Sequence, residues 1–212
     1  MNASNSKSTA LEKYLSLLLG LMEDRDWIKL EHAALSNHNT FSVVSKAISD
    51  MKEFNGMTLL HASLRFDPPA NVLDKMIKLY PQALTQQDCL GRLPLHVAAG
   101  SGASPIVIKL LTMNYPQACG IQDEDGRTPL HLYCDTSCEL FEDCEQSREP
   151  PSLDTIRTLL SGSLAAATFE DLDGMNAVEY AIISDAPIGV VKLLQKASQK
   201  VNKTKTNHPS PR

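Results

Sequence analysis

The sequence has few aromatic residues and no apolar segment long enough to cross a membrane. Phe, Trp and Tyr make up 5% of the 212 residues, with one Trp, a composition typical of helical repeat proteins with thin aliphatic cores. The apolar run at residues 14–22 (YLSLLLGLM) is far too short to span a bilayer. It is followed by EDRD and by no small-residue cleavage site, which argues against a secretory signal. The five cysteines are an odd number, which favours reduced thiols. We therefore expect a cytoplasmic or nuclear protein that is not secreted and does not contact membranes.

The sequence also lacks the short motifs that carry common catalytic chemistry. It has no glycine-rich phosphate loop, no His-Glu-x-x-His helix and no Gly-x-Ser-x-Gly elbow. No pair of acidic residues is placed for acid–base work. The sequence predicts a non-enzymatic protein with no cofactor and no small-molecule substrate.

Charge is divided unevenly along the chain. The formal net charge is −5, yet residues 192–212 hold six of the 20 Lys and Arg and none of the 25 acids. The body is therefore acidic, and an acidic surface repels the phosphate backbone of nucleic acids. This argues against nucleic acid as the main partner.

A unit of 35 residues recurs along the chain. Residues 56–61 (GMTLLH) recur as residues 91–96 (GRLPLH) and 126–131 (GRTPLH), each 35 residues apart. A weaker copy at residues 174–179 (GMNAVE) follows after 48 residues, one period plus about 13 inserted residues. Such a period indicates units that stack to form a continuous core.

Each part of the unit has a local physical reason. The glycine suits a tight turn, since positive φ costs glycine little. An aspartate three residues before the glycine can accept hydrogen bonds from turn amides; it is Asp88, Asp123 or Asp171. Thr58 and Thr128 suit helix N-caps, and Pro94 and Pro129 suit a first helical position. A second helix is then predicted to begin at Pro69, Pro105 and Pro187.

These residues resemble the ankyrin repeat family, whose unit is a turn, Gly, Thr-Pro-Leu-His, a small helix, a longer helix and a return loop. Residues 128–131 (TPLH) match fully, and residues 93–96 (LPLH) and 58–61 (TLLH) match at three of four positions. The resemblance implies structural roles for a set of motif residues: Gly56, Thr58, His61, Gly91, Pro94, His96, Gly126, Thr128, Pro129, His131 and Gly174. It also implies that the three histidines tie each turn to neighbouring backbone.

The expected fold is an all-α ankyrin-repeat solenoid of stacked helix-turn-helix units with β-turn or hairpin tips. Residues 56–198 would hold four units, beginning near residues 56, 91, 126 and 174, with an acidic insertion at about residues 135–149. Residues 9–55 would form a helical N-terminal cap, with helices over residues 9–22, 26–36 and 41–51 and a buried stripe of Trp27, Ile28, Leu30 and Leu35. Residues 1–8 and the basic tail, residues 199–212, are predicted to be disordered.

Cysteines and one histidine near the insertion suggest a weaker, chemical alternative. His131, Cys134, Cys138 and Cys144 have the number and type of ligands that suit tetrahedral zinc. No Cys-x-x-Cys spacing occurs, and His131 already has a place in the repeat. We therefore predict no metal and keep Cys134, Cys138 and Cys144 only as a candidate zinc- or redox-sensing cluster.

The insertion and the tail leave two further alternatives open. The insertion holds six acids and one base, and it is either a binding loop or a solvated loop. The tail lysines are spread out, which favours a solubilising segment over a nuclear signal. A nuclear regulatory protein that uses both segments is the alternative function.

The resemblance implies a concave contact surface, made of the turn tips and the exposed side of the first helices, that binds another protein. Arg92 and Arg127 on this surface would grip acidic groups. We predict a monomeric adaptor or scaffold. Its partner-binding residues would be Phe54, Asn55, Met57, Arg65, Phe66, Cys89, Leu90, Arg92, Ser101, Glu124, Asp125, Arg127, Asp135, Thr136, Leu172, Asp173 and Met175.

Overall fold

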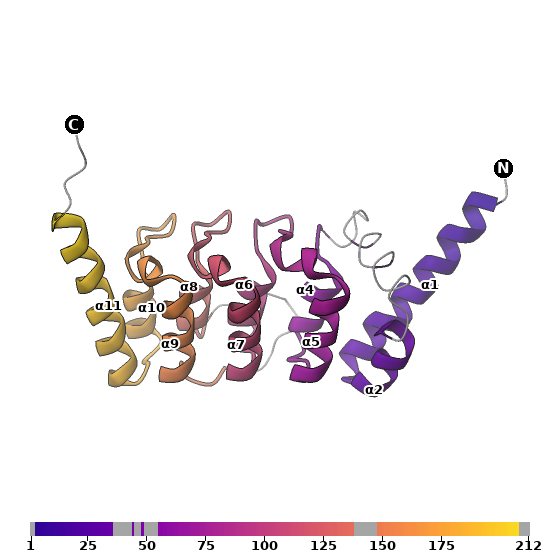
Figure 1. Cartoon of the computed structure of the whole chain (residues 1–212), viewed down its shortest axis with the longest axis horizontal. Coiled ribbons are helices and arrows are strands. Elements are labelled where there is room, and N and C mark those ends of the chain that lie inside the picture. Colours follow the sequence, from indigo (N-terminus) through magenta and orange to yellow (C-terminus); the bar gives the residue numbers. More distant parts are fainter. Residues whose placement is uncertain (1–2, 36–43, 45–47, 49–54, 138–147, 208–212) are drawn as a thin grey trace.

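The structure is a row of stacked helix pairs with an additional helical segment at its N-terminal end (Figure 1). The computed structural model describes residues 3–35, 44, 48, 55–137 and 148–207. All the elements in these residues are helical, as the sequence predicts. Within the same residues, no helix combines the length and the apolar content needed to cross a membrane.

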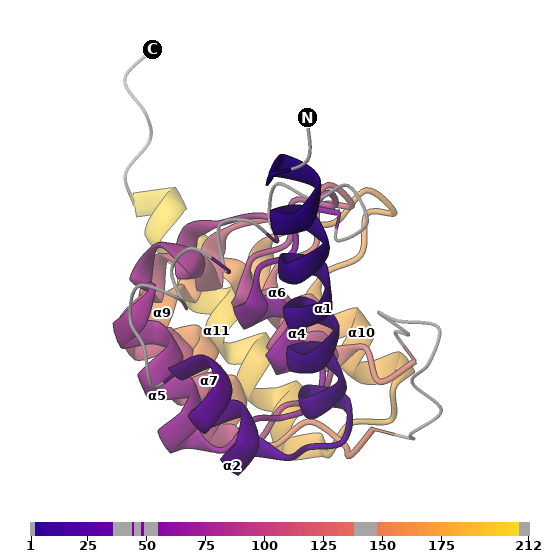
Figure 2. The ribbon, with the colours of Figure 1, turned by 90° about the vertical axis from the view of Figure 1, so that its right-hand side faces the viewer.

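Each unit of the row pairs a short first helix with a longer second helix. First helices pack on first helices and second helices on second helices, which gives the two layers seen from the end of the row in Figure 2. The described residues hold four pairs. They are α4 (Leu59–Leu64) with α5 (Ala70–Leu79), α6 (Pro94–Gly100) with α7 (Pro105–Asn114), α8 (Pro129–Cys134) with α9 (Leu153–Gly162), and α10 (Ala177–Ile183) with α11 (Ile188–Asn207).

The helices of the four repeat units begin at the predicted residues or next to them. Pro94, Pro105 and Pro129 occupy the first positions of α6, α7 and α8, where a missing N–H does no harm. Thr58 caps α4, and its hydroxyl oxygen accepts the backbone N–H of His61 at 3.3 Å. Three short 3₁₀ helices then return the chain toward the next tip: η3 (Pro81–Thr85), η4 (Pro116–Gly120) and η5 (Leu164–Thr168).

A continuous aliphatic core runs along the row between the two layers. The second helix α5 buries Val72, Leu73, Met76 and Ile77, which are spaced along one helical face. The short helix α6 is buried along its whole length and contains two alanines, so its neighbours can approach closely. Since each pair exposes an apolar face that only the next pair covers, the units are stable only as a stack.

The N-terminal segment packs against the first pair. It consists of α1 (Ala3–Glu23), α2 (Trp27–Leu30) and the π-helix η1 (Glu31–Leu35), of which α1 contacts α4 and η1 contacts α5. The Tyr14 hydroxyl donates a 2.5 Å hydrogen bond to the backbone oxygen of Ala33, which joins α1 to η1. We propose that this segment is the cap predicted from the sequence.

Two expectations for the N-terminal segment are wrong. Helix α1 begins at Ala3, so residues 3–8 are helical rather than disordered. Leu15, Leu18 and Met22 anchor this helix further along, and a nucleated helix gains a hydrogen bond with each added residue. Ile28 is 76% exposed and leaves the predicted stripe, whereas Leu30 is buried. The predicted helix at residues 41–51 lies outside the described residues except for Val44 and Ile48, which are both buried.

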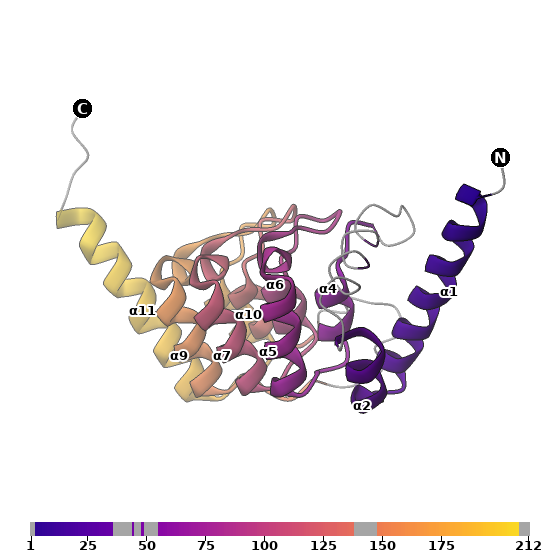
Figure 3. The ribbon, with the colours of Figure 1, turned by 45° about the vertical axis from the view of Figure 1, so that its right-hand side comes forward.

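The predicted disorder of the C-terminal tail is also wrong up to Asn207. Helix α11 continues to Asn207 and reaches beyond the rest of the stack (Figure 3). Leu194, Ala197 and Val201 are buried, and their spacing of three and four residues continues one helical face into the lysine-rich segment. The charge of the lysines masks this apolar stripe in the sequence. Residues 208–212 lie outside the described part of the chain.

The interruption of the third unit falls between its two helices. Helix α8 ends at Cys134 and α9 begins at Leu153, whereas four residues separate α6 from α7. Residues 138–147 lie outside the described residues. Both edges of the interruption, residues 135–137 and 148–152, are described and contact the first helices.

Candidate functional site

The turn tips project together along one edge of the row, at the top of Figure 1. The tip of the second unit is a β-turn in which the Gly91 N–H donates to the Asp88 backbone oxygen at 3.0 Å. One carboxylate oxygen of Asp88 accepts the N–H groups of Leu90 and Arg92, at 3.0 and 2.9 Å. Asp123 and Asp171 accept the corresponding turn amides of the third and fourth units. The role predicted for these aspartates is confirmed.

The three repeat histidines connect neighbouring units. In His61, Nδ1 accepts the N–H of Thr58 at 3.1 Å, and Nε2 lies 3.1 Å from the Arg92 backbone oxygen. A carbonyl only accepts, so Nε2 carries the proton and donates. His96 reaches the Ile121 backbone oxygen and His131 that of Phe169, both at 3.0 Å. These residues are structural, as the sequence predicts.

Burial keeps these histidines neutral. It lowers the pKa of His61 and of His96 to about 4, partly opposed by the hydrogen bonds to the neighbouring unit. Burial also lowers the pKa of His131. A neutral imidazole presents one donor and one acceptor, which is what each of the three sites uses.

A second set of hydrogen bonds joins each tip directly to the next. The N–H of Cys89 donates to the Asn55 oxygen at 2.7 Å, that of Glu124 to Leu90 at 2.9 Å, and that of Leu172 to Asp125 at 3.0 Å. The glycines permit this close approach: a Cβ on Gly126 would lie 3.0 Å from Asp171 Cα, at a φ of +78°. Backbone hydrogen bonds therefore join the four tips into one continuous edge.

The two arginines predicted to grip a partner are used inside the protein. Arg92 is buried, and its guanidinium forms two 2.8 Å contacts with one oxygen of Asp88, through Nε and Nη2. Arg127 is partly buried, lies 3.6 Å from Asp135 and 3.7 Å from Asp171, and stacks over the Tyr180 ring at 5.3 Å. The prediction of a partner contact is therefore wrong for Arg92, whereas Arg127 is partly exposed and already lies beside two acids. For Arg92 the Asp-x-x-Gly-Arg spacing of residues 88–92 was the available indication, since it places the acid and the base across one turn, whereas the acids beside Arg127 come from outside its own turn.

The other predicted tip residues are accessible to different degrees. Asn55, Cys89, Leu90, Glu124, Asp125, Leu172 and Asp173 are exposed, and Met57 and Met175 are partly exposed. Phe54 lies outside the described residues. We call these seven exposed residues the tip row.

Comparison with known families agrees with this geometry. A family model described as ankyrin repeats (many copies) matches residues 76–132, which run from the end of α5 to the middle of α8. The chain therefore contains ankyrin repeats, which the family model matches over residues 76–132. Ankyrin repeats generally mediate protein–protein interaction. No curated protein matches the chain.

The first helices of the ankyrin array offer less free surface than the sequence predicts. Arg65 and Phe66 are partly exposed beside α4, with the Arg65 guanidinium 5.6 Å from the Phe66 ring centroid. Ser101 and Thr136 are also partly exposed, and the Thr136 N–H donates to the Ser184 hydroxyl at 3.0 Å. Asp135 is buried beside Arg127 and accepts from Ser137, so its prediction as a contact residue is wrong.

Arg148, at the end of the insertion, has a role that the sequence analysis missed. Its guanidinium donates to the backbone oxygens of Ala99, Leu132 and Asp135, at 2.8, 3.1 and 2.7 Å. These carbonyls lie at the C-terminal ends of α6 and α8, where positive charge is favourable, and the Ala99 oxygen also accepts the Gly102 N–H at 3.2 Å. Arg148 thus joins the insertion to two neighbouring repeats.

The described part of the cysteine cluster has the character of core. Cys134 is fully buried, and burial raises its thiol pKa to about 12, so it is a poor thiolate ligand. Both ring nitrogens of His131 already have partners. Among the described residues, no three His, Cys, Asp or Glu side chains gather as metal ligands. Cys138 and Cys144 lie outside the described residues.

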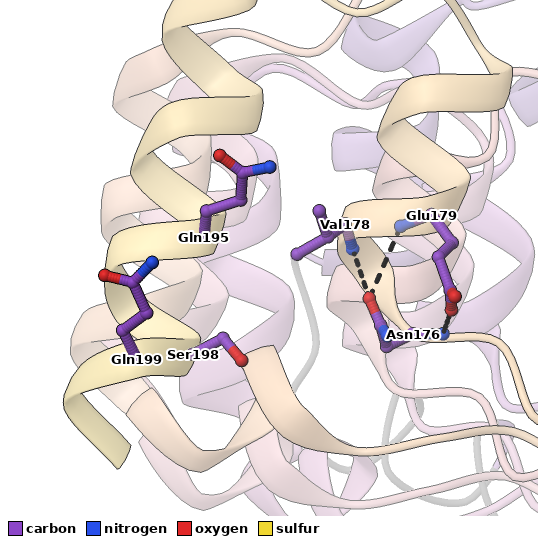
Figure 4. Close-up of a pocket in the computed structure, with 6 residues that line it drawn as sticks. All are labelled: Asn176, Val178, Glu179, Gln195, Ser198 and Gln199. Carbon is purple, nitrogen blue, oxygen red and sulfur yellow. Dashed lines mark hydrogen bonds between the residues drawn. The ribbon is translucent and has the colours of Figure 1, made fainter. Parts of the chain in front are cut away.

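A shallow pocket lies between α10 and α11 (Figure 4). It has a volume of 460 Å³ and is lined by Asn176, Val178, Glu179, Gln195, Ser198 and Gln199. Asn176 Oδ1 accepts the N–H groups of Val178 and Glu179, and the Glu179 carboxylate accepts the Asn176 N–H at 2.8 Å. Glu179 occupies the histidine position of the unit, but its side chain returns to its own helix cap. The two polar side chains that Asn176 and Glu179 contribute to the pocket therefore serve helix capping.

Proposed function

We propose that this ankyrin-repeat protein is a non-catalytic adaptor or scaffold that binds another protein through its tip row. The observation that carries the proposal is that the tip side chains are exposed while hydrogen bonds hold the backbone beneath them in place. Leu172 is 78% exposed and Leu90 is 43% exposed, yet the amides beside them are held by turn and tip-to-tip hydrogen bonds. Exposed apolar side chains on a fixed frame favour binding, since little entropy is lost on docking.

Two further features support a binding role. The pKa shifts of His61, His96 and Asp171 have structural causes, namely burial in the repeat interfaces and hydrogen bonds within the repeats. The pocket between α10 and α11 holds one carboxylate, which caps a helix. We propose further that the protein is a monomer of the cytoplasm or nucleus. The nuclear alternative depends on the insertion and tail, whose residues 138–147 and 208–212 lie outside the described part.

The test compares two pairs of neutral substitutions at exposed apolar residues. Leu90→Ser/Leu172→Ser alters the tip row, and Ile106→Ser/Met113→Ser alters exposed residues of α7 in the other layer. Proteins captured from a cell extract by the wild-type chain should be lost with the first pair and retained with the second. Thermal unfolding of both variants checks that each is folded.

Two results would contradict the proposal. The first is equal capture by both variants, and the second is loss confined to the α7 pair. Since neither pair changes charge, the result does not depend on the electrostatic character of the partner.

A further inference from the structure

The exposed charge of the tip row is negative, the reverse of what its arginines suggest in the sequence. Glu124, Asp125 and Asp173 are exposed on the third and fourth tips, and Glu170 is exposed just before the fourth. In the described part of the chain, none of these four carboxylates forms a salt bridge. The positive charge of Arg92 and Arg127 is directed inward, to Asp88 and to Asp135 and Asp171. A partner therefore meets carboxylates.

The pKa shift of Asp123, in the third tip, is consistent with this concentration of negative charge. Burial raises the pKa of Asp123, and the Asp125 carboxylate beside it adds to the rise. Arg127 lies close by, but its hydrogen-bonding and charge effects only partly oppose these two causes. The third tip is thus a place where an added positive charge relieves repulsion.

Apolar side chains alternate with the acids along the tip row. The Glu124 N–H donates to the Leu90 oxygen, which places an acid beside an exposed leucine. The Leu172 N–H donates to the Asp125 oxygen, which places an exposed leucine beside the next acid. A binding segment that lies along the tips meets leucine, acid, leucine and acid in turn.

The frame under these side chains is fixed. The Gln122 side-chain amide donates to the Gly126 oxygen at 2.6 Å and to the Glu170 oxygen at 3.0 Å, a link between the third and fourth tips. Asp123 and Asp171 hold the amides of their own turns. A row fixed in this way selects partners by the spacing of their charges.

We propose that the tip row binds an extended segment of a partner protein in which Lys or Arg residues alternate with aliphatic residues. This inference rests on the proposed function and adds the chemistry of the partner. Adjacent packed helices lie about 10 Å apart, which equals about three residues of an extended chain at about 3.3 Å each. The basic residues should therefore recur about every third position. The same carboxylates repel nucleic acid and anionic lipid surfaces.

The probes are three synthetic peptides of about 13 residues, a length that spans the tips in extended form. The first has Lys at every third position, with Leu and Ser between. The second replaces Leu with Ser, and the third replaces Lys with Glu. Binding is measured by calorimetry at two salt concentrations, and the contacted amides are identified by NMR.

The first peptide should bind the wild-type chain more tightly than the other two, and more weakly at high salt. When this peptide binds, the NMR signals of four backbone amides should shift, those of Leu90, Glu124, Asp125 and Leu172. Glu124→Lys/Asp125→Lys should weaken it at least about tenfold, because attraction becomes like-charge repulsion. The control Glu23→Lys/Asp24→Lys makes the same change of net charge at the end of α1, away from the tips, and should change binding less than about twofold.

Three outcomes overturn the inference. They are equal or tighter binding of the Glu peptide, an equal loss in the control variant, and no binding of the Lys–Leu peptide. The serine pairs described above remain a separate test. If capture depends on Leu90 and Leu172 while the Lys–Leu peptide fails, the proposed function stands and the basic partner does not.

Discussion

At the scale of single residues, the buried histidines determine how stability responds to acid. His61 and His96 have pKa values of about 4 in the folded chain, against an ordinary value of 6.5. Between these values the unfolded chain binds protons that the folded chain does not, so stability falls as the pH falls. The two histidines therefore leave the free energy of unfolding unchanged well above pH 6.5, and they lower it progressively as the pH falls from 6.5 toward 4.

We therefore predict a loss of unfolding free energy between pH 7.5 and pH 5.5. One unit below the unfolded pKa, His61 and His96 each contribute a loss of roughly 1.4 kcal/mol. Urea titrations at the two pH values measure this difference. His96→Asn should remove the part of this pH-dependent loss of unfolding free energy that comes from one histidine. His32→Ala, at an exposed histidine of η1, should leave the loss unchanged. Equal stability at both pH values would refute the prediction.

The turn glycines, the capping threonines and the prolines at helix starts were predictable because local backbone geometry determines each of them. A turn glycine, a capping threonine and a proline at a helix start are determined by φ and by local hydrogen bonds, and all three recur with the period. The accessibility of Arg92 was not predictable in the same way. Its burial depends on the neighbouring turns packed around it, and a sequence pattern does not report packing.

At the scale of elements, Arg148 fixes the end of the insertion to the C-terminal ends of α6 and α8. The bonded residues Arg148 and Ala99 are 49 positions apart, and no period of the sequence relates them. The repeat pattern therefore indicates that an insertion exists, and only the folded arrangement shows where it is attached. The extension of α11 was missed for a related reason, since a buried stripe of three residues is hard to see among lysines.

Arg148→Ala should lower the free energy of unfolding by about 2 to 3 kcal/mol, because three partly buried carbonyls lose a charged donor. Arg148→Lys should recover only part of this, since an ammonium lacks the planar fork of the guanidinium. The control is Arg157→Ala, which breaks an exposed pair with Asp154 and should cost less than about 0.5 kcal/mol. Urea denaturation measures all three.

Hydrogen exchange separates a local role of Arg148 from a general one. The Thr136 amide, bonded to Ser184 at the start of the insertion, should exchange faster in Arg148→Ala. Equal stability of the alanine variants at positions 148 and 157 would show that the three bonds to Arg148 contribute nothing.

At the scale of the whole molecule, the units form a one-dimensional stack in which each contacts only its neighbours. A unit at the end can open by losing one interface, whereas an interior unit must lose two.

The boundary between the third and fourth units depends on Asp171. Its carboxylate accepts the Tyr180 hydroxyl at 2.6 Å and lies 3.7 Å from Arg127. Burial alone would raise the pKa of Asp171, but the hydrogen bonds from Tyr180, Met175 and Asp173 lower it.

Asp171→Asn and Asp88→Asn should therefore differ in how far their effects spread. Both keep an oxygen for the turn amides and remove the oxygen that holds an arginine. Asp171→Asn should cost about 1 to 2 kcal/mol and speed hydrogen exchange mainly in α10 and α11. Asp88→Asn deprives the buried Arg92 of its salt bridge, so it should cost about 3 kcal/mol and speed exchange in α4 to α9 as well. If Asp171→Asn speeds hydrogen exchange equally in all helices from α4 to α11, the fourth unit does not open independently. The array then unfolds as one cooperative body.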